Sequence, residues 1–362
     1  MLRAEQFVKG SLPTLLISPQ DVAKIIKTQG FKATIDGMVE YMYQDYLRWD
    51  EFDKCARFGS LVDNGVLELM PIASPEQYSF KYVNCHPHNP NNGLSTVLAF
   101  GALMSNDNGK PEVISDFTLT TALRTASMSV LAARYLARPN SKRMAIIGNG
   151  CQSEFQALAF HHALGITELA VYDIDRAASE KLARNLANTD IKVEIFDSVA
   201  AAVKGADIVT TVTAEYSRAH ILTKDMIEPG MHINAVGGDN LGKTELDPAI
   251  LTMGDVYIEF EPQTRIEGEI QNMPEDFPVK YLFEVFKANK HVRKSDDEVT
   301  IFDSVGFALE DFSAIRYIAD AAVQLGLVEP IAIVPDLADP KDLFGYIDLV
   351  TEEKEQPMLR RA

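Results

Sequence analysis

The sequence predicts an α/β fold, in which a Rossmann-type doubly wound parallel sheet is joined to a second, α+β domain. Residues 144–302 alternate short apolar strands with amphipathic helices, and this order is typical of a parallel sheet. A glycine-rich turn follows the first of these strands. The first third of the chain instead combines helices with strands that alternate in hydrophobicity. At roughly 150 residues per domain, 362 residues suggest about two domains.

Two helices and an antiparallel sheet are expected before residue 119. Between Asp21 and Trp49, apolar residues recur at intervals of three and four, as amphipathic helices require. Residues 56–70 alternate around Asn64-Gly65, and Asn-Gly between alternating segments is the strongest short-range signal of a hairpin. Three further strands are expected at Tyr78–Asn84, Thr96–Ser105 and Glu112–Ser115.

A long helix begins at Leu119 and ends before Arg138, and the parallel sheet follows it. Its strands are expected at Met144–Ile147, Leu169–Tyr172, Val193–Phe196, Ile208–Val212, His232–Val236, Val256–Phe260 and Val299–Phe302. Several are continuous apolar segments, as strands covered on both faces should be. A helix over Phe307–Leu325 returns the chain to the first domain. The expected domains are residues 1–130 together with 326–362, and residues 131–325.

Composition and charge argue against several classes of partner. Acidic residues outnumber basic ones, 52 to 34, and no dense Lys/Arg segment exists to bind nucleic acid or an anionic membrane. The longest weakly charged segment, Leu119–Ala133, is too short to span a bilayer. Residues 1–10 lack the apolar core of a signal peptide. Three cysteines without C-x-x-C spacing fit a reducing, cytoplasmic compartment, and no histidine spacing predicts a metal site.

The turn after the first parallel strand predicts a dinucleotide site. Gly148 and Gly150 give a tight turn and a bare backbone, so that a pyrophosphate can approach the N-terminus of the next helix. Ser153 replaces the third glycine of the usual fingerprint. Asp173 ends the next strand, where an acid binds the ribose hydroxyls of NAD and repels a 2'-phosphate. Alternatively, Asp173 caps the following helix, a role that Asp175 could supply instead.

Two later strands of the sheet also end in polar residues. Thr213 follows the fourth strand, and Gly237-Gly238-Asp239 follows the fifth. Ligands of such folds lie beyond the carboxyl ends of the strands, so both places face the cofactor. Asp239 is either a general acid/base or simply the end of a turn.

The hairpin predicts a substrate site of mixed charge. If Asn64-Gly65 is its turn, Leu61 pairs with Glu68, and Arg57 shares one face with Glu68. One cation and one anion on an otherwise apolar face would suit a zwitterion. Lys81, on the next strand, adds a second cation. The alternative is that these are ordinary surface charges.

Arg124 is the only charged residue between Leu119 and Ala133. A buried arginine requires an anionic partner, because an unpaired charge is costly to desolvate. A phosphate or a carboxylate would satisfy it. The alternative is that Arg124 lies on the exposed side of its helix.

Four segments resemble the ornithine cyclodeaminase and mu-crystallin family. They are Gly148–Gln156, Asn234–Asp239, Glu261–Glu269 and Phe302–Asp311. The likeness extends from about Phe31 to about Tyr346, and it is far more specific than the glycine turn. It is stronger to the family's ornithine-converting members than to its imine reductases and alanine dehydrogenases.

The resemblance implies a homodimer, whose first domain supplies dimer contacts and substrate groups and whose second domain holds NAD tightly. By motif, Arg57, Lys81 and Arg124 bind the substrate carboxylate, Glu68 and Val305 also contact the substrate, and Asp239 is the acid/base. The implied cofactor contacts, besides Gly148 and Gly150 of the turn, are Thr96, Arg124, Cys151, Gln152, Asp173, Thr213, Val236, Gly237, Gly238, Asp239, Lys243 and Ser304. Cys151 stands where many relatives have alanine.

The reaction that this resemblance implies converts L-ornithine to L-proline and ammonia. NAD would take a hydride from Cα, and the δ-amine would attack the imine so formed. Ammonia loss and return of the hydride would then yield L-proline. Ring closure is intramolecular, so orientation supplies much of the rate. Asp239 would move protons among the amines, and no net oxidation occurs.

Two other functions fit the same residues. A dehydrogenase or ketimine reductase would exchange its cofactor at every turnover. A crystallin-like binding protein would keep the nucleotide without catalysis, but the presence of Arg57, Lys81, Arg124 and Asp239 together argues against it.

Overall fold

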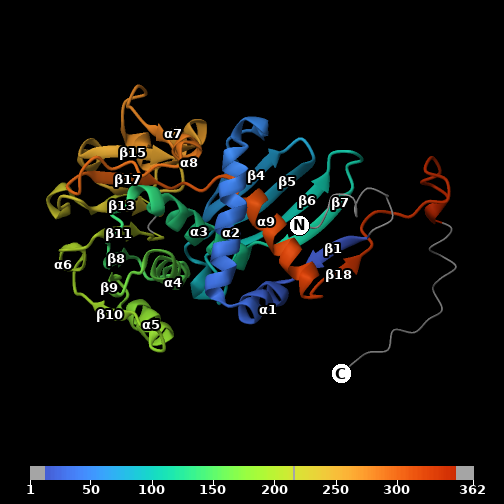
Figure 1. Ribbon diagram of the computed structural model, residues 1–362. Helices are drawn as coiled ribbons and strands as arrows, with labels where there is room; N and C mark the ends of the chain where they lie inside the picture. The colour runs from blue at the N-terminus through green and yellow to red at the C-terminus, as the bar shows by residue number, and fades with distance from the viewer. Residues whose placement is uncertain (1–12, 215–216, 348–362) are drawn as a thin grey trace.

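The computed structural model describes residues 13–214 and 217–347 (Figure 1). Within them, the chain forms two eight-stranded sheets and a small two-stranded one. One large sheet is parallel throughout, and the other is mostly antiparallel. The predicted α/β class is therefore confirmed. The expectation about a signal peptide falls on residues 1–10, outside the described residues.

The mostly antiparallel sheet contains both the first and the last strand of the described chain. Its order is β18-β1-β7-β6-β5-β4-β2, with β3 also paired to β4. The strands are β1 (Thr14–Ile17), β2 (Asp53–Lys54), β3 (Phe58–Val62), β4 (Gly65–Ala73), β5 (Gln77–Cys85), β6 (Val97–Ser105), β7 (Pro111–Asp116) and β18 (Glu329–Ile331). Sequence reasoning located β3 to β7 but missed the short strands β1 and β2.

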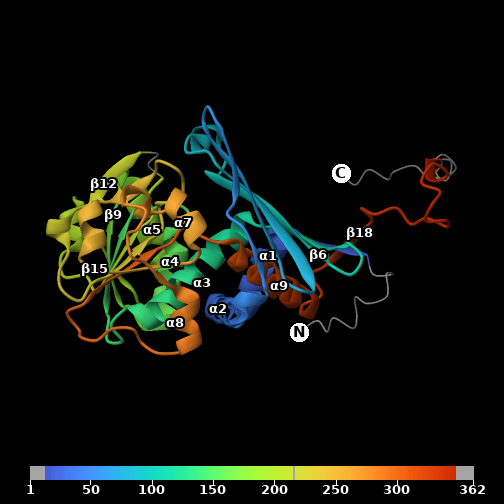
Figure 2. The same cartoon turned by 90° about the horizontal axis from the view of Figure 1, so that it is seen from above.

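Three helices cover one face of this sheet (Figure 2): α1 (Pro19–Gln29), α2 (Phe31–Leu47) and α9 (Ala308–Gln324). The first begins with a capping box, in which the side chains of Ser18 and Asp21 each accept a backbone N–H of the other residue. Helix α9 contacts β4, β5 and β6 directly. The C-terminal part of the chain is thereby packed against the sheet formed by its beginning.

The hairpin of β3 and β4 differs from the predicted register. Its turn is Asp63-Asn64, so Gly59, not Leu61, pairs with Glu68. Gly65 lies in the strand, where a Cβ would stand only 2.3 Å from the carbonyl oxygen of Cys85 on β5. The predicted pairing is therefore wrong by two residues. A shift of two keeps every side chain on its predicted face.

All seven predicted strands of the parallel sheet are present, within two residues of the expected bounds. They are β8 (Arg143–Ile147), β9 (Glu168–Tyr172), β10 (Lys192–Ile195), β11 (Ile208–Thr211), β13 (His232–Ala235), β15 (Gly254–Ile258) and β17 (Val299–Asp303), and β16 (Lys280–Tyr281) adds an edge. The order is β10-β9-β8-β11-β13-β17-β15-β16. The strand order reverses between β8 and β11, and ligands of such sheets bind at this switch point.

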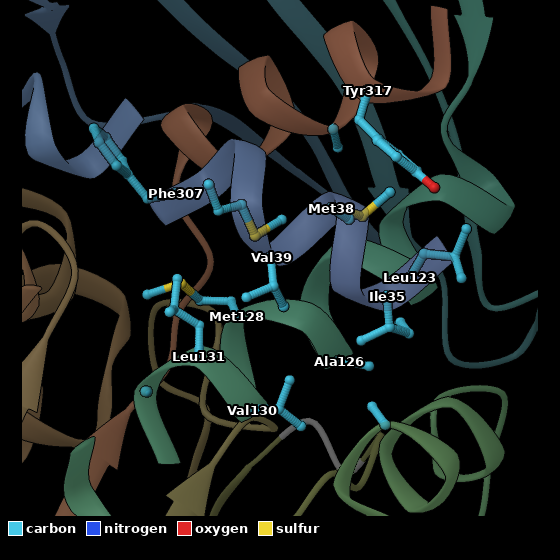
Figure 3. Packing of buried hydrophobic residues seen from close by; sticks show 14 of the residues in the cluster. Ile35, Met38, Val39, Leu123, Ala126, Met128, Val130, Leu131, Phe307 and Tyr317 are labelled. Carbon is cyan, nitrogen blue, oxygen red and sulfur yellow. The ribbon is translucent and has the colours of Figure 1, made fainter. Parts of the chain in front are cut away.

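The remaining elements surround the parallel sheet. They are α3 (Thr118–Leu136), α4 (Ser153–Leu164), α5 (Arg176–Leu186), α6 (Val199–Val203), α7 (Glu261–Glu267), α8 (Leu282–Ala288), and the paired strands β12 (Arg218–Leu222) and β14 (Thr244–Leu246). Figure 3 shows how α3 meets α2 and α9 in one buried core. This core joins the helices of the first sheet to those of the second.

No helix in residues 13–214 and 217–347 is long and apolar enough to cross a bilayer. Nor does that part of the chain bring together three His, Cys, Asp or Glu side chains that could hold a metal ion.

The Phe286 ring links α8 to the core and gives a test of this packing. Fully buried, it contacts the rings of Tyr43, Tyr46 and Tyr135 with centroid separations of 5.3–6.2 Å. Phe286→Ala should lower the free energy of unfolding by about 3–5 kcal/mol, because it leaves a cavity. Ile266→Ala, at a residue 50% exposed, is the control and should change it by about 0.5 kcal/mol or less. Equal stabilities in urea denaturation would contradict this packing.

Candidate active site

A cavity of about 830 Å³ lies between the carboxyl ends of the parallel strands and the mostly antiparallel sheet, here called the first sheet. Every residue that the sequence analysis selected lines it, except Gly238. The lining residues from that set are Arg57, Glu68, Lys81, Thr96, Arg124, Gly148, Gly150, Cys151, Gln152, Asp173, Thr213, Val236, Gly237, Asp239, Lys243, Ser304 and Val305. Residues far apart in the sequence are thus brought to one space at the switch point of the sheet.

The glycine turn after β8 leaves room for a dinucleotide. A Cβ on Gly150 would meet nothing within 4 Å, so the backbone is open to a ligand there. Gly148 has a φ of +93° and passes close to the backbone of Val212. The Ser153 hydroxyl donates to the carbonyl oxygen of Gly150 at 2.8 Å, which holds the turn against the start of α4. These residues fit the pyrophosphate of NAD.

Asp173 lies at the end of β9, next to the glycine turn. Its carboxylate accepts the backbone N–H of Asn149 at 2.6 Å and that of Asp175 at 2.8 Å. Asp175, not Asp173, caps helix α5 by accepting the N–H of Ala177. Arg176 donates to Asp197 at 2.9 Å and is therefore already paired.

Ile174 is a lining residue that the sequence analysis missed. Its side chain is 92% exposed at the mouth of the cavity, directly after Asp173. An apolar side chain at this place suits the face of an adenine ring. The only signal in the sequence was its position after the strand-ending acid.

Two buried carboxylates explain the double glycine before Asp239. A Cβ on Gly237 would stand 2.2 Å from Glu245 Oε1, and one on Gly238 would stand 2.3 Å from Glu269 Oε1. Glu245 accepts the backbone N–H of Gly237 at 3.0 Å and both the N–H and the hydroxyl of Thr213. The glycines therefore let the loop pack against both acids, of which Glu245 also binds its backbone.

Asp239 projects from this loop with its side chain 40% exposed, and it accepts from Lys243 Nζ at 2.8 Å. Lys243 itself is buried. Burial would lower the pKa of Lys243, but the nearby Asp239 carboxylate raises it above its usual value. Lys243 thus stays charged and orients Asp239, the acid/base candidate.

Lys81 and Arg124 are buried cations that share one carboxylate. Lys81 Nζ lies 2.9 Å from Asp311, and Arg124 Nε lies 3.1 Å from the same carboxyl group. Arg124 Nη1 also donates to Glu310 at 2.8 Å. The exposed alternative for Arg124 is excluded, and its anionic partners are carboxylates of α9. Burial, with repulsion from Arg124, lowers the pKa of Lys81 to about 8.

Arg57 is equally enclosed. Its guanidinium lies 3.1 Å from both Glu68 and Glu267, and Nη2 donates to the carbonyl oxygens of Val305 and Gly306, each at 2.7 Å. The surface alternative for Arg57, Glu68 and Lys81 is excluded, because all three side chains are at most 6% exposed. Burial raises the pKa of Glu267 to about 7, although Arg57 opposes the shift.

Sequence reasoning missed the acids that hold these cations. Glu267, Glu310 and Asp311 all lie in the segments that carry the family resemblance. Nothing in the sequence alone indicated that they would pair with Arg57, Lys81 and Arg124.

Known proteins share this fold and sequence. The profile of the ornithine cyclodeaminase/mu-crystallin family matches residues 21–325. An ornithine cyclodeaminase from Brucella abortus biovar 1 (strain 9-941) is 47% identical over 331 residues, covering 91% of this chain and 92% of that protein.

Two solved structures are also similar. A lysine cyclodeaminase described as recognising L-lysine, L-ornithine and L-2,4-diaminobutyric acid aligns with a TM-score of 0.85 and 30% identity, covering 91% of this chain and 99% of that one. An archaeal alanine dehydrogenase dimer with bound NAD aligns with a TM-score of 0.80 and 29% identity, covering 89% and 100%.

The fold and the cavity define an α/β enzyme scaffold with a dinucleotide cradle beside buried cations. The chain belongs to the ornithine cyclodeaminase/mu-crystallin family. The resemblance noted in the sequence is therefore confirmed.

The position of Asp173 generates a prediction about cofactor choice. If Asp173 accepts the ribose hydroxyls, as the sequence predicts, Asp173→Ser should weaken NAD binding about 10- to 100-fold. The preference for NAD over NADP should shrink with it, since a 2'-phosphate no longer meets a like charge. The measurement is fluorescence titration of cofactor-stripped protein.

Asp175→Ser is the matched control. It removes a neighbouring negative charge but keeps a good helix-capping residue. Its NAD/NADP preference should match that of the parent protein. Equal affinities of the parent for NAD and NADP would refute this role of Asp173.

Proposed function

We propose that the protein is an ornithine cyclodeaminase, which converts L-ornithine to L-proline and ammonia with tightly bound NAD as cofactor. The observation that carries this proposal is one cavity that joins a dinucleotide cradle to two buried cations and an oriented carboxylate. The 47% identity to an ornithine cyclodeaminase over 91% of the chain supports the choice of substrate.

The cofactor is NAD, which supplies a reversible hydride acceptor when bound. Gly148 and Gly150 would receive its pyrophosphate, and Asp173 its ribose hydroxyls. Thr96, Arg124, Cys151, Gln152, Thr213, Val236, Gly237, Gly238, Asp239, Lys243 and Ser304 are the further proposed contacts. Because Gly238 faces Glu269 and not the cavity, its proposed contribution is through the backbone of the loop.

The buried cations bind the substrate carboxylate in this proposal. Lys81 and Arg124 are held by Asp311, and both residues line the cavity. Arg57 would assist from the other side, and Glu68 and Val305 would contact other parts of the substrate. A carboxylate fixed at this point leaves both amines of L-ornithine free to reach the acids of the cavity.

Asp239 acts as the general acid/base. Its exposed side chain and its pairing with Lys243 keep a carboxylate available at the edge of the cavity. It would accept a proton from an amine before attack and return one when ammonia leaves. Ring closure within one molecule needs orientation more than a further reactive group, and the enclosed cavity supplies it.

A simple dehydrogenase is the second candidate, because the alanine dehydrogenase dimer has the same fold with bound NAD. It would share the cradle and the carboxylate site. The two functions differ in whether NAD is consumed in proportion to product.

We also propose a homodimer, formed through the outer face of the first sheet. Phe58, Leu69, Tyr82 and Phe100 are paired in register across β3, β4, β5 and β6. Three of them are exposed, Phe58 at 62%, Leu69 at 38% and Phe100 at 47%. A contiguous apolar row of this kind marks a protein interface. The archaeal relative is described as a dimer.

The remaining parts of the proposal are the domains and the compartment. Residues 1–130 with 326–362 would form the substrate-binding and dimerisation domain, and residues 131–325 the NAD domain, whose last helix, α9, packs against the sheet of the other domain. Cys55, Cys85 and Cys151 are all free thiols, which supports a reducing cytoplasm.

Incubation with L-ornithine and a catalytic amount of NAD tests the function. Proline and ammonia should form in equal amounts, and far in excess of the NAD supplied, because the hydride returns within each turnover. Chromatographic assay of proline and enzymatic assay of ammonia measure both products. Product limited to the amount of NAD would instead favour the dehydrogenase.

The role of Asp239 generates a separate prediction. Asp239→Asn should bind NAD as the parent does but lose about 10²- to 10⁴-fold in kcat, the usual contribution of general acid/base catalysis. Asp107→Asn, on the exposed loop between β6 and β7, is the control and should retain full activity. An Asp239→Asn variant within a few-fold of the parent would mean that another group moves the protons.

A further inference from the structure

The turn Ser304-Val305-Gly306 lies between the guanidinium groups of Arg57 and Arg124. Arg57 Nη2 donates to the carbonyl oxygens of Val305 and Gly306 at 2.7 Å each. On the other side, a Cβ on Gly306 would stand 2.5 Å from Arg124 Nη1, and Gly306 has a φ of +80°. The turn therefore binds the Arg57 guanidinium directly and leaves room for that of Arg124.

Glu259 holds the turn through hydrogen bonds that its buried side chain accepts. It directly follows β15, and its side chain is buried at 1% exposure. Its carboxylate accepts three donors from the turn, the Ser304 hydroxyl at 3.2 Å, the Val305 N–H at 3.2 Å and the Gly306 N–H at 3.1 Å. Glu259 does not line the cavity.

Gln263 connects the turn to the backbone of Arg57 by hydrogen bonds. From helix α7, buried at 2% exposure, its Nε2 donates to the Gly306 carbonyl oxygen at 2.7 Å. Its Oε1 accepts the backbone N–H of Arg57 at 3.2 Å, 206 residues away in the sequence. The Gly306 carbonyl oxygen thus accepts hydrogen bonds from both Gln263 and the Arg57 side chain. Gln263 in turn accepts the backbone N–H of Arg57. Gln263 does not line the cavity either.

We propose that Glu259 and Gln263 are positioning residues for the substrate carboxylate site, acting through the 304–306 turn and Arg57 without touching substrate or cofactor. Buried side chains that orient binding groups by hydrogen bonds fix their geometry before the ligand arrives. The two residues also tie Arg57, from the start of the hairpin, to the parallel sheet. This inference rests on the proposed function, since it concerns the binding of that substrate.

The test uses Gln263→Glu, which keeps the shape and the acceptor for the Arg57 N–H but loses the donor to Gly306. The KM for L-ornithine should rise about 10- to 100-fold, as expected for a lost contact in a charged hydrogen-bonded ring, with a smaller effect on kcat. The affinity for NAD should fall less than that for L-ornithine, because the glycine turn after β8 and Asp173 are untouched and only Ser304 and Arg124 of the proposed NAD contacts adjoin the 304–306 turn. Gln44→Glu, on the exposed side of α2, controls for the added charge.

A double-mutant cycle separates positioning from general stability. In an Arg57→Ala background, Gln263→Glu should raise KM by less than twofold, because the group through which it acts is gone. Equal effects of Gln263→Glu in both backgrounds would overturn the proposal. So would an unchanged KM in the single variant.

Glu259→Gln provides a second line of evidence if Gln263→Glu folds poorly. The Val305 N–H and the Gly306 N–H bond to different oxygens of Glu259, and the amide of Gln has only one oxygen. At least one of these two N–H groups should therefore exchange with deuterium faster in the NAD-bound protein. KM should rise together with this exchange. Faster exchange with unchanged KM would leave Glu259 a purely structural residue. A parent protein that makes no proline would instead refute the proposed function, which the variants do not test.

Discussion

The site depends on a buried ion cluster in which one carboxylate, Asp311, faces two cations from different elements. Lys81 comes from β5, Arg124 from α3 and Asp311 from the first turn of α9. Removing one partner of a buried pair is strongly destabilising, because it leaves an uncompensated charge. The cluster therefore fixes three elements relative to one another at the cavity. Its acids lie at the N-terminus of α9, where the helix dipole favours negative charge.

Further buried acids near the carboxyl-end edge of the parallel sheet also have their partners inside the protein. Glu245, Glu269 and Asp303 each accept two or more donors, mostly backbone N–H groups of the segments that connect the parallel strands. Desolvation raises the pKa of Asp303 to about 7, while the backbone N–H groups of Glu269 and Ile270 act against it. Loops at this edge carry the cavity residues, so satisfying their N–H groups internally gives them one conformation. The double glycine at 237–238 is the feature of the sequence that this packing requires.

The sequence predicted most of the fold because the signals are local. Continuous apolar segments such as Met144–Ile147 identify strands buried on both faces, and Gly148 and Asp173 follow their strands at fixed positions. The pairing of Arg57 with Glu267, or of Arg124 with Glu310, is set by tertiary packing, which no local pattern encodes. The hairpin register failed for a related reason. An Asn-Gly pair favours a turn, but the close approach of Cys85 to Gly65 requires that glycine in the strand.

The charge state of the cavity then explains how a carboxylate could bind where every cation is already paired. Lys81 and Arg124 face Glu310 and Asp311, so the two acids offset most of the positive charge of the two cations. The free-energy cost of desolvating them is offset during folding, before any ligand enters. An incoming carboxylate then needs only the N–H groups that the acids leave free. Such preorganised donors lose little on binding, whereas solvated surface cations would first have to shed water. The acids compete with the substrate for these cations, but they also allow the cations to be buried and preorganised for binding.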